Sequence, residues 1–328
     1  MIIQENVKLS EILWYKIGGV TKYLLTCVTK EDIYEAVEFI NKNDIKKIFV
    51  CGLGSNLVFT DEYFDGAVIR ITTKEKSTNN IHLIENGDEK IVEAFAGSLL
   101  DEVIKFSLNK NLTGLEWAGG LPGTVGAAVR GNVGAYGGEI KESLFSAEVL
   151  IRDETGRYEI QTFQNKALNF SYRHSLIKDN PGNFIVLTAK FRLKSGNSQE
   201  VNEANKTYDL HISQRKERHP LEYPNCGSVF KNIREPEKIK RVLEVLPDIQ
   251  EKIQSNWYGK VAAGYLIQRL GLQGYKIGDA QVSTKHALFI VNLGQAKAQE
   301  VVQIIDIIQQ KFIDTFGFKL DPEVEIVS

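Results

Sequence analysis

Residues 115–139 are the most glycine-rich part of this 328-residue chain and constrain its fold most strongly. Eight glycines stand there, at positions 119, 120, 123, 126, 131, 134, 137 and 138. Apolar residues such as Val125 and Val129 lie between them, which a polar, flexible linker would not show. Because glycine costs backbone entropy and packs no side chain, the run predicts a place where the backbone closely approaches another group. A phosphate or a flat cofactor held by bare N–H groups is a frequent group of that kind.

Length and composition favour a multidomain globular protein. For 328 residues, two or three domains are expected. The formal net charge of −2 gives no reason to expect nucleic-acid binding, and no apolar run reaches the length of a membrane span. The first residues do not form a secretory signal, so we expect a cytoplasmic protein without membrane insertion. The three cysteines and five histidines are scattered, so neither a disulfide framework nor a metal site is indicated.

A strand, an amphipathic helix and a second strand are predicted within residues 23–51. Thr29 is the expected N-cap of the helix, and Asp32 is its capping-box partner. Such a sequence of elements within thirty residues predicts a βαβ-like unit.

The second strand runs into the loop Gly52-Leu53-Gly54-Ser55-Asn56. Gly-x-Gly after a strand suggests a dinucleotide fingerprint, but Leu57 occupies the place of the third glycine. Val58-Phe59 then reads as a strand, whereas a Rossmann site needs a helix N-terminus there, so we reject that fold. The loop is either a phosphate loop that uses its own amides or a simple strand-to-strand turn.

Short strands dominate the chain up to about residue 195, which predicts an α+β arrangement of two lobes. The expected elements are a strand at 66–71, hairpins at 81–96 and 145–160 with turns at 86–88 and 154–156, a helix at 99–109 and a strand at 184–193. Beyond residue 197 we expect a second compact α/β domain, extending to about 320. Its elements are helices at 199–217, 237–254, 261–270 and 295–316, a turn into a strand at 225–232, and strands at 288–293 and 320–327.

Five motifs follow one another in a definite order. They are Gly52–Asn56, residues 121–137 of the glycine-rich stretch, Tyr172-Arg173-His174-Ser175, residues 225–232 (Asn-Cys-Gly-Ser-Val-Phe-Lys-Asn), and Asp321-Pro322-Glu323-Val324. Together they make the chain resemble the UDP-N-acetylenolpyruvoylglucosamine reductases, flavoenzymes that complete UDP-N-acetylmuramate in peptidoglycan synthesis. The resemblance runs from about residue 14 to 327. Any one motif is weak, but five in order are specific.

The resemblance implies a vanillyl-alcohol-oxidase or PCMH-type FAD-binding fold. Its two lobes would occupy residues 1–70 and 71–196, and an α/β substrate-binding domain would occupy 197–328, with the last strand packing back near the flavin. The FAD pyrophosphate would lie against the amides of residues 53–56 and 123–125. The implied cofactor-binding residues are Gly52, Leu53, Gly54, Ser55, Asn56, Leu57, Gly119, Pro122, Gly123, Thr124, Val125, Ala127, Ala128, Asn132 and Gly134.

The resemblance also implies the chemistry. NADPH would reduce the FAD, which would reduce UDP-N-acetylglucosamine enolpyruvate through an enolate-like intermediate. Arg173 would face the substrate carboxylate, and Ser228 would donate the proton. Glu323 would hydrogen-bond that carboxylate and would have to be protonated, because two carboxylates repel; Glu325, two residues on, is its rival. Without the resemblance, each residue reads as an ordinary surface or turn residue.

Five further residues are expected to bind the substrate, namely Tyr136, Arg215, Arg218, Lys231 and Asn232. The family more often has lysine at the position of Arg218 and glutamine at that of Arg269, so Arg269 is a doubtful contact, and Arg130 stays unassigned. The segment between Arg173 and Arg215 indicates the shorter family branch, which lacks an extra tyrosine-bearing loop. Two alternatives stay open: another FAD-dependent oxidoreductase of the same fold that acts on a small alcohol or sugar, and a non-catalytic binder of flavin or sugar nucleotide.

Overall fold

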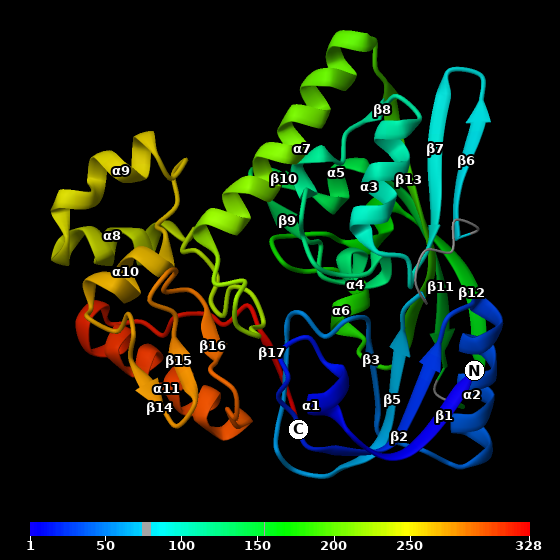
Figure 1. Ribbon diagram of the computed structural model, residues 1–328, viewed down its shortest axis with the longest axis horizontal. Coiled ribbons are helices and arrows are strands. Elements are labelled where there is room, and N and C mark those ends of the chain that lie inside the picture. The colour runs from blue at the N-terminus through cyan, green and yellow to red at the C-terminus, as the bar shows by residue number, and fades with distance from the viewer. Residues whose placement is uncertain (74–79, 154) are drawn as a thin grey trace. The chain divides into compact units, whose positions relative to one another are not determined.

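The computed structural model describes residues 1–73, 80–153 and 155–328. The chain forms two compact units, each assembled from separate segments (Figure 1). Unit 1 consists of Met1–Val7, Thr21–Leu53 and Tyr63–Glu217, and unit 2 consists of Lys8–Val20, Gly54–Glu62 and Arg218–Ser328. The chain therefore leaves unit 1 within the predicted phosphate loop, between Leu53 and Gly54. The domain limits expected at residues 70 and 196 stay a prediction.

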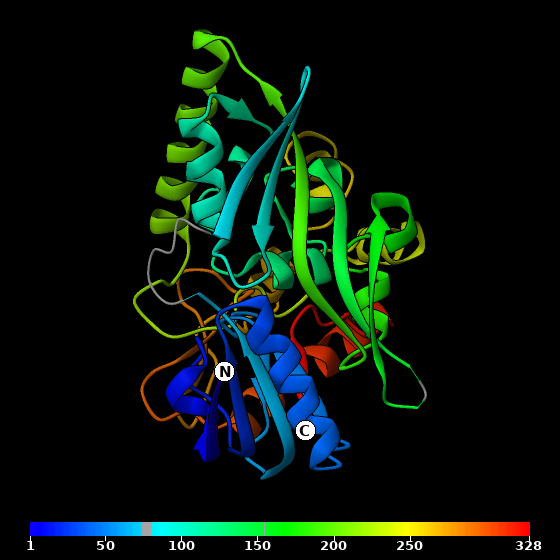
Figure 2. The same ribbon diagram turned by 90° about the vertical axis from the view of Figure 1, so that its right-hand side faces the viewer.

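One sheet of unit 1 has four strands in the order β1-β2-β5-β3. The strands are β1 (Ile2–Lys8), β2 (Val20–Cys27), β5 (Phe64–Ile71) and β3 (Ile48–Cys51). β2 and β3 both run parallel to β5, and helix α2 (Lys30–Lys42) connects them along one face of the sheet (Figure 2). The predicted strand–helix–strand unit is thereby confirmed.

The predicted start of α2 is also confirmed. The amide of Asp32 donates to Thr29 Oγ1 at 3.1 Å, and the amide of Thr29 donates to Asp32 Oδ2 at 3.0 Å. This reciprocal pair is a capping box, which satisfies amides that a helix start leaves without partners.

The second sheet of unit 1 has the order β12-β11-β13-β7-β6, with β8 paired to β13. The strands are β6 (Ile81–Asn86), β7 (Glu89–Phe95), β8 (Leu112–Thr113), β11 (Leu144–Arg152), β12 (Tyr158–Gln164) and β13 (Phe184–Ser195). The antiparallel pairs β6–β7 and β11–β12 confirm both predicted hairpins. Glu154, which belongs to the second predicted turn, lies outside the described residues.

Helices and a small hairpin complete unit 1. They are α3 (Leu100–Asn109), α4 (Val125–Arg130), α5 (Ile140–Ser143), α6 (Leu176–Asp179), α7 (Ser198–Arg218), two 3₁₀ turns (Glu116–Ala118 and Asn165–Leu168), β9 (Gly134–Ala135) and β10 (Gly138–Glu139). The sequence predicts α3 and α7 but not α4, which forms inside the glycine-rich stretch. Its helical hydrogen bonds and its packing against β7 and β13 outweigh the poor helix propensity of glycine.

Unit 2 contains a three-stranded sheet, helices and one parallel strand pair. Its elements are α1 (Leu9–Ile12), β4 (Leu57–Phe59), α8 (Pro236–Val245), α9 (Gln250–Ser255), α10 (Ala263–Arg269), β14 (Lys276–Ile277), β15 (Ala280–Val282), β16 (Ile290–Asn292), α11 (Ala298–Phe316) and β17 (Glu325–Val327). Val58 and Phe59 form a strand, as predicted, and β4 pairs in parallel with β17 from the C-terminal end.

Three expectations for this part of the chain are wrong in detail. The single helix expected at 237–254 is broken after Val245, because Pro247 disfavours the helical region for the residue before it, and a 3₁₀ turn follows at Pro247–Ile249. The last strand begins at Glu325 instead of residue 320, since Pro322 lacks an amide proton. Residues 225–232 form no strand, only isolated bridges such as Phe230 with Pro322.

Each unit has its own hydrophobic core. In unit 1 the core lies between α2, α3 and the strands, with Val103 and Phe191 fully buried. In unit 2 it gathers around α10, α11 and the small sheet, with Leu266 and Phe312 fully buried. None of the helices in the described ranges is both long and apolar enough to cross a membrane.

Candidate active site

The two predicted cofactor loops meet at Gly52 and Thr124, both in unit 1. A Cβ atom on Gly52 would lie 2.3 Å from Thr124 Oγ1, far inside contact distance. Thr124 is buried, and it immediately precedes α4. The backbone of the Gly52 loop therefore approaches the glycine-rich stretch so closely that only glycine fits. The sequence predicts that these two loops lie together, and the structure brings Gly52 of one loop against Thr124 of the other.

The first two amides of α4 donate hydrogen bonds to backbone carbonyls of the protein, although the sequence predicts that the Val125 amide faces a phosphate. Val125 N–H donates to the carbonyl of Ser98 at 2.9 Å, and Gly126 N–H donates to that of Ala96 at 2.8 Å. A Cβ on Gly126 would also lie 2.9 Å from Ala96 Cβ. The amide of Val125 thus already has a partner within the protein, and its expected contact with a phosphate stays a prediction. Val125 itself is fully buried and packs in the core.

Two buried polar atoms near this turn lack a partner among the described residues. One is the hydroxyl of Ser98, a residue only 1% exposed, whose backbone is bonded to Val125. The other is Nε of Arg70, which lies beside Cys51 in the β3–β5 register at the strand end that leads into Gly52. Buried polar groups are rarely left unpaired. The Ser98 hydroxyl and Arg70 Nε are both hydrogen-bond donors close to the Gly52 loop, so they could bind a group rich in oxygen atoms, such as a pyrophosphate.

Sequence reasoning missed Ser98 and Arg70, although each carried a signal. Gly97-Ser98 follows a strand just as Gly54-Ser55 does, and Arg70 comes directly after the apolar run 67–69 of its strand. Both patterns are weak on their own. Gly-Ser is common in ordinary turns, and the long side chain of an arginine in a strand can reach solvent.

Most other glycines of the stretch bring protein close to protein. A Cβ on Gly119 would lie 2.6 Å from the carbonyl of Tyr208, and one on Gly138 would lie 2.4 Å from the Trp117 ring. Asn132, a predicted cofactor residue, is fully buried, and its amide nitrogen donates to Glu139 and to the Ser171 carbonyl. These residues build the frame around the Gly52–Thr124 contact, and the frame explains much of the glycine content.

Arg173 has the unusual backbone angle φ +61°. Its Nη2 donates to the carbonyl of Gly134 at 2.7 Å, and its guanidinium lies 4.9 Å from the centre of the Tyr172 ring. A non-glycine residue in the left-handed region is a strained feature that often marks a functional position. Arg173 is thereby held against the β9–β10 hairpin.

The same hairpin carries Tyr136, and α7 brings Arg215 to it. The guanidinium carbon of Arg215 lies 5.2 Å from the centre of the Tyr136 ring, and its Nε donates to the carbonyl of Gly119 at 3.0 Å. Burial lowers the pKa of Arg215, but an arginine stays charged at any physiological pH. Three predicted residues of unit 1, namely Arg173, Tyr136 and Arg215, therefore gather around one hairpin.

In unit 2, Ser228 and Glu323 come from distant parts of the sequence but lie in adjacent segments. The amide of Glu323 donates to the carbonyl of Val229, the residue after Ser228, at 2.7 Å. The side-chain amide of Asn56 donates to the carbonyl of Glu323 at 3.2 Å. The second half of the predicted phosphate loop thus lies beside the predicted catalytic residues of this unit.

The rival glutamate has another environment. Glu325 belongs to β17 and is paired with Leu57 of β4. The Glu325 amide donates to the Asn56 carbonyl at 3.2 Å, whereas the Glu323 amide donates to the residue after Ser228.

The remaining predicted residues divide into three kinds. The amide of Lys231 is bonded to the Asp321 carbonyl, and Asn232 Oδ1 accepts from the Ala263 amide at the start of α10, so both adjoin the Ser228 segment. Arg218 is exposed at the end of α7. Arg269 pairs with Asp248 at 3.0 Å and contacts Tyr265, which leaves its place as a substrate contact in doubt.

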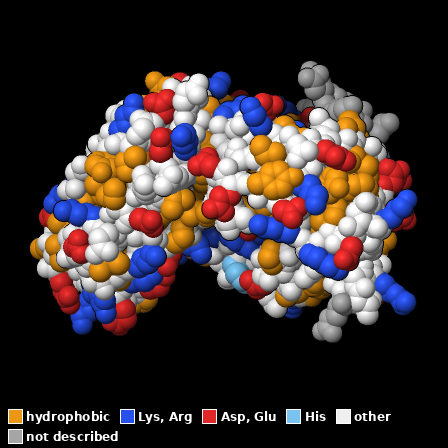
Figure 3. Space-filling view, turned by 90° about the horizontal axis from the view of Figure 1, so that it is seen from below, with side chains coloured by type: hydrophobic (Ala, Val, Ile, Leu, Met, Phe, Trp, Pro, Cys, Tyr) orange, Lys and Arg blue, Asp and Glu red, His pale blue; other side chains and the backbone are white. Residues whose placement is uncertain are grey.

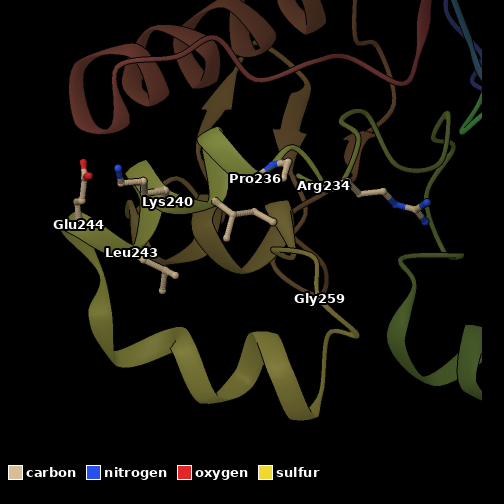
Figure 4. A pocket seen from close by; sticks show the side chains of 7 residues that line it. Arg234, Pro236, Lys240, Leu243, Glu244 and Gly259 are labelled. Carbon is tan, nitrogen blue, oxygen red and sulfur yellow. The ribbon is translucent and has the colours of Figure 1, made fainter.

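A groove of about 600 Å³ lies elsewhere in unit 2, beside α8 (Figure 4). Its lining residues are Arg234, Pro236, Ile239, Lys240, Leu243, Glu244 and Gly259. None of the predicted site residues lines it. Charged side chains of both signs are interspersed on the face drawn in Figure 3, in keeping with the small net charge. Within the described ranges, no group of three or more His, Cys, Asp or Glu residues is arranged to hold a metal ion.

The fold of unit 1 and its glycine turn define the class of protein as an FAD-binding flavoprotein. The model of the FAD-binding domain family matches residues 21–157, which include both loops of the Gly52–Thr124 contact. The model of the UDP-N-acetylenolpyruvoylglucosamine reductase C-terminal domain matches residues 219–327.

Similar proteins extend the match to the whole chain. The chain is 37% identical to a UDP-N-acetylenolpyruvoylglucosamine reductase of Latilactobacillus sakei over 99% of its own length and 93% of the relative's. It is 36% identical to one of Listeria monocytogenes over 99% and 95%. The crystal structure of the enzyme from Thermus caldophilus superposes with a TM-score of 0.72 at 27% identity, and both chains are covered completely. The chain belongs to the UDP-N-acetylenolpyruvoylglucosamine reductase family.

Proposed function

We propose that this chain reduces UDP-N-acetylglucosamine enolpyruvate to UDP-N-acetylmuramate, with NADPH as the reductant and FAD as the cofactor, in peptidoglycan synthesis. The observation that carries the proposal is the pairing of the Glu323 and Ser228 segments, in a chain that is 37% identical to a reductase of this name across 99% of its length. A place in the cytoplasm, where nucleotide precursors are made, is part of the proposal.

The FAD is held by the two glycine loops in this proposal. Gly52, Thr124 and the unpaired hydroxyl of Ser98 form a cradle, in which the amides of Gly123 and Thr124 replace that of Val125 as donors to phosphate. Arg70 adds a positive charge at the carboxyl end of β5. Bound FAD would supply the redox chemistry, namely hydride transfer from NADPH to the terminal carbon of the enolpyruvyl ether.

The other predicted cofactor residues keep supporting roles. Ser55 and Asn56 continue the Gly52 loop along the chain, and Leu57 follows them as the first residue of β4. Pro122 shapes the turn before Gly123. On α4 the small side chain of Ala128 is buried and that of Ala127 is exposed, so neither adds bulk beside the loop. Gly119, Asn132 and Gly134 act by supporting the loop.

Arg173 stabilises the negative charge that hydride addition creates. The new electron pair spreads from the carbon next to the carboxylate into that carboxylate, so the intermediate is an enolate. A guanidinium is planar and permanently charged, and it can hold both carboxylate oxygens. The bond from Arg173 to the Gly134 carbonyl supports this role, because it restrains the direction of the side chain.

Ser228 gives its hydroxyl proton to the carbon that carries the negative charge. The product then has one hydrogen from the hydride and one from Ser228, and the serine oxygen recovers a proton from solvent. A hydroxyl is a weak acid, so the transfer needs positive charge nearby, for which Lys231 is the candidate within unit 2.

Glu323 donates a hydrogen bond from its protonated carboxyl to the substrate carboxylate. The hydrogen bond from its backbone amide to the Val229 carbonyl supports this role, because it holds the Glu323 backbone beside the segment that carries Ser228. Tyr136, Arg215, Arg218 and Asn232 bind the rest of the substrate, with Arg215 and Arg218 as the cations that meet its anionic groups, while Lys231 acts near Ser228. We also propose that the chain belongs to the shorter family branch.

Two properties of the chain count against an oxidase with covalently attached flavin. Burial raises the pKa of each of the thiols Cys27, Cys51 and Cys226 to about 12, so they stay protonated at neutral pH and are poor nucleophiles. The Ser228–Glu323 arrangement has no use in the oxidation of a small alcohol.

The proposal is tested by anaerobic spectroscopy of the purified protein. The expected result is a yellow protein that bleaches with NADPH and regains its colour when UDP-N-acetylglucosamine enolpyruvate is added. A colourless protein that also fails to take up FAD on refolding refutes the flavoenzyme. Bleaching without reoxidation by this substrate refutes the reaction and leaves an oxidoreductase with another substrate.

A further inference from the structure

The ring of Tyr136 lies flat on the ring of a histidine that has no role in the reaction proposed above. The Tyr136 and His211 ring centres are 3.9 Å apart, and the planes are inclined by only 1°. His211 is on α7 and is 9% exposed, whereas Tyr136 is on the β9–β10 hairpin and is 44% exposed. Helix α7 passes beside this hairpin in Figure 1. A buried ring therefore supports one that faces solvent.

The hairpin alone is poorly suited to hold Tyr136. Each of its strands has two residues, and Tyr136 has φ +52°, a conformation that costs energy for any residue with a Cβ atom. Isolated short hairpins are marginally stable in water. The conformation of Tyr136 thus needs support from outside the hairpin, and the stacked ring of His211 provides it.

His211 itself is well anchored. Its Nδ1 lies 3.4 Å from the carbonyl oxygen of Glu116, which accepts from it. Arg215 follows one helical turn later on the same face of α7 and points at the same tyrosine, with its guanidinium carbon 5.2 Å from the ring centre. One face of α7 therefore holds Tyr136 with an aromatic ring and places a cation beside it.

We propose that His211 is a positioning residue, which holds Tyr136 at the height and angle where its ring and the Arg215 guanidinium together receive the anionic substrate. The proposal rests on the function proposed above, because it takes Tyr136 and Arg215 as substrate-binding residues. His211 acts through Tyr136 and does not touch the substrate. It affects the step that uses the enolpyruvyl substrate and leaves the NADPH step alone.

The test compares variants of the FAD-loaded enzyme. His211→Ala and His211→Gln remove the flat ring, and Gln keeps a polar group near Glu116. His211→Phe restores the ring. Aromatic pairs contribute enough that removal should raise the KM for UDP-N-acetylglucosamine enolpyruvate about three- to tenfold. The dissociation constant, measured at equilibrium from the change in flavin absorbance, should rise by the same factor. The rate of flavin reduction by NADPH should stay within about twofold of wild type, and His211→Phe should recover most of the loss.

A double-mutant cycle decides whether His211 acts through Tyr136. In a Tyr136→Ala background, His211→Gln should change the KM no further, because the contact is already gone. His82→Ala, on the exposed strand β6, is the matched control and should behave as wild type. FAD content and thermal midpoints are recorded for all variants. If His211→Ala does not fold, the Gln and Phe variants carry the comparison.

Three outcomes overturn the proposal. One is an unchanged KM in both ring-deleting variants, another is additive effects in the cycle, and the third is an equal loss in the NADPH step. A wild-type enzyme that bleaches with NADPH but is not reoxidised by the substrate refutes the proposed function instead, and the positioning role falls with it.

Discussion

The backbone amide of Glu323 donates a hydrogen bond of 2.7 Å to the carbonyl oxygen of Val229. The amide of Val229 in turn donates to the carbonyl of Leu288 at 2.8 Å, which ties the segment to the small sheet of unit 2. Backbone bonds of this kind do not depend on the side chains, so they persist when Ser228 or Glu323 is substituted. The roles of the two side chains can therefore be tested without moving the segments that carry them.

Removal of the Ser228 hydroxyl should separate the two half-reactions. Ser228→Ala keeps the rate of flavin reduction by NADPH, but it slows reoxidation by the enolpyruvyl substrate by about 10²- to 10⁴-fold, the usual contribution of a general acid. Stopped-flow absorbance of the flavin measures both steps. Ser255→Ala, an exposed serine of α9, is the control. Reoxidation at the normal rate in Ser228→Ala would exclude this serine as the proton donor.

Replacement of Glu323 by glutamine should slow flavin reoxidation less than replacement by alanine. Glu323→Ala loses the hydrogen bond to the substrate carboxylate and slows reoxidation by about 10²-fold or more. Glu323→Gln retains an N–H donor, so its loss should be clearly smaller. Glu325→Ala, two residues further on and at the start of β17, should stay close to wild type. If the Glu325 variant is the more impaired one, the two glutamates have been assigned the wrong way round.

Gly52→Ala should weaken FAD binding through a clash with one side chain. The new methyl group would lie 2.3 Å from Thr124 Oγ1, and overpacking of this kind costs about 1–3 kcal/mol. Thr124→Ala removes that oxygen, so the double variant should bind FAD better than Gly52→Ala alone. Gly131→Ala is the control, since its Cβ would have an ordinary contact of 3.4 Å with Ala127. Flavin fluorescence titration of the apoprotein gives the affinities, and equal loss in single and double variants would contradict the clash.

His286 should make unit 2 less stable in mild acid. Burial lowers the pKa of His286 below its usual value of 6.5, while Nδ1 accepts from the Leu288 amide. The unfolded chain therefore binds a proton more readily than the folded one, and stability is lost as pH falls below about 6.5. His286→Asn, which can still accept from Leu288, should show a smaller fall in thermal midpoint between pH 7.5 and 5.5. Exposed His82→Asn should leave the fall unchanged, and a His286→Asn variant with the wild-type slope would rule out this histidine as the cause.

Local patterns determined much of the fold. The capping box at Thr29 and Asp32, the two hairpins and helices α3 and α7 follow from side-chain period, caps and turn residues, which act within a few positions along the chain. Helix α4 escaped this reasoning, because its one glycine, Gly126, is a poor helix former and is needed there for its close approach to the distant residue Ala96. The break at Pro247 follows from a local rule, because proline disfavours the helical conformation of the residue before it, which an amphipathic pattern alone does not show.

By itself, the sequence determined the family, the FAD chemistry and the candidate residues Arg173, Ser228 and Glu323. The reason is that the motifs and their order can be read from the chain without knowing which residues are in contact. Only the tertiary structure decided what the glycines do: Gly52 admits Thr124, while Gly119 and Gly138 admit other parts of the protein. It also showed that the Glu323 amide bonds to Val229, that the Val125 amide bonds to Ser98, and that the His211 ring stacks on Tyr136. The physical reason is that these features are close approaches between residues far apart in sequence, and a one-dimensional pattern does not encode which distant atoms will share a contact.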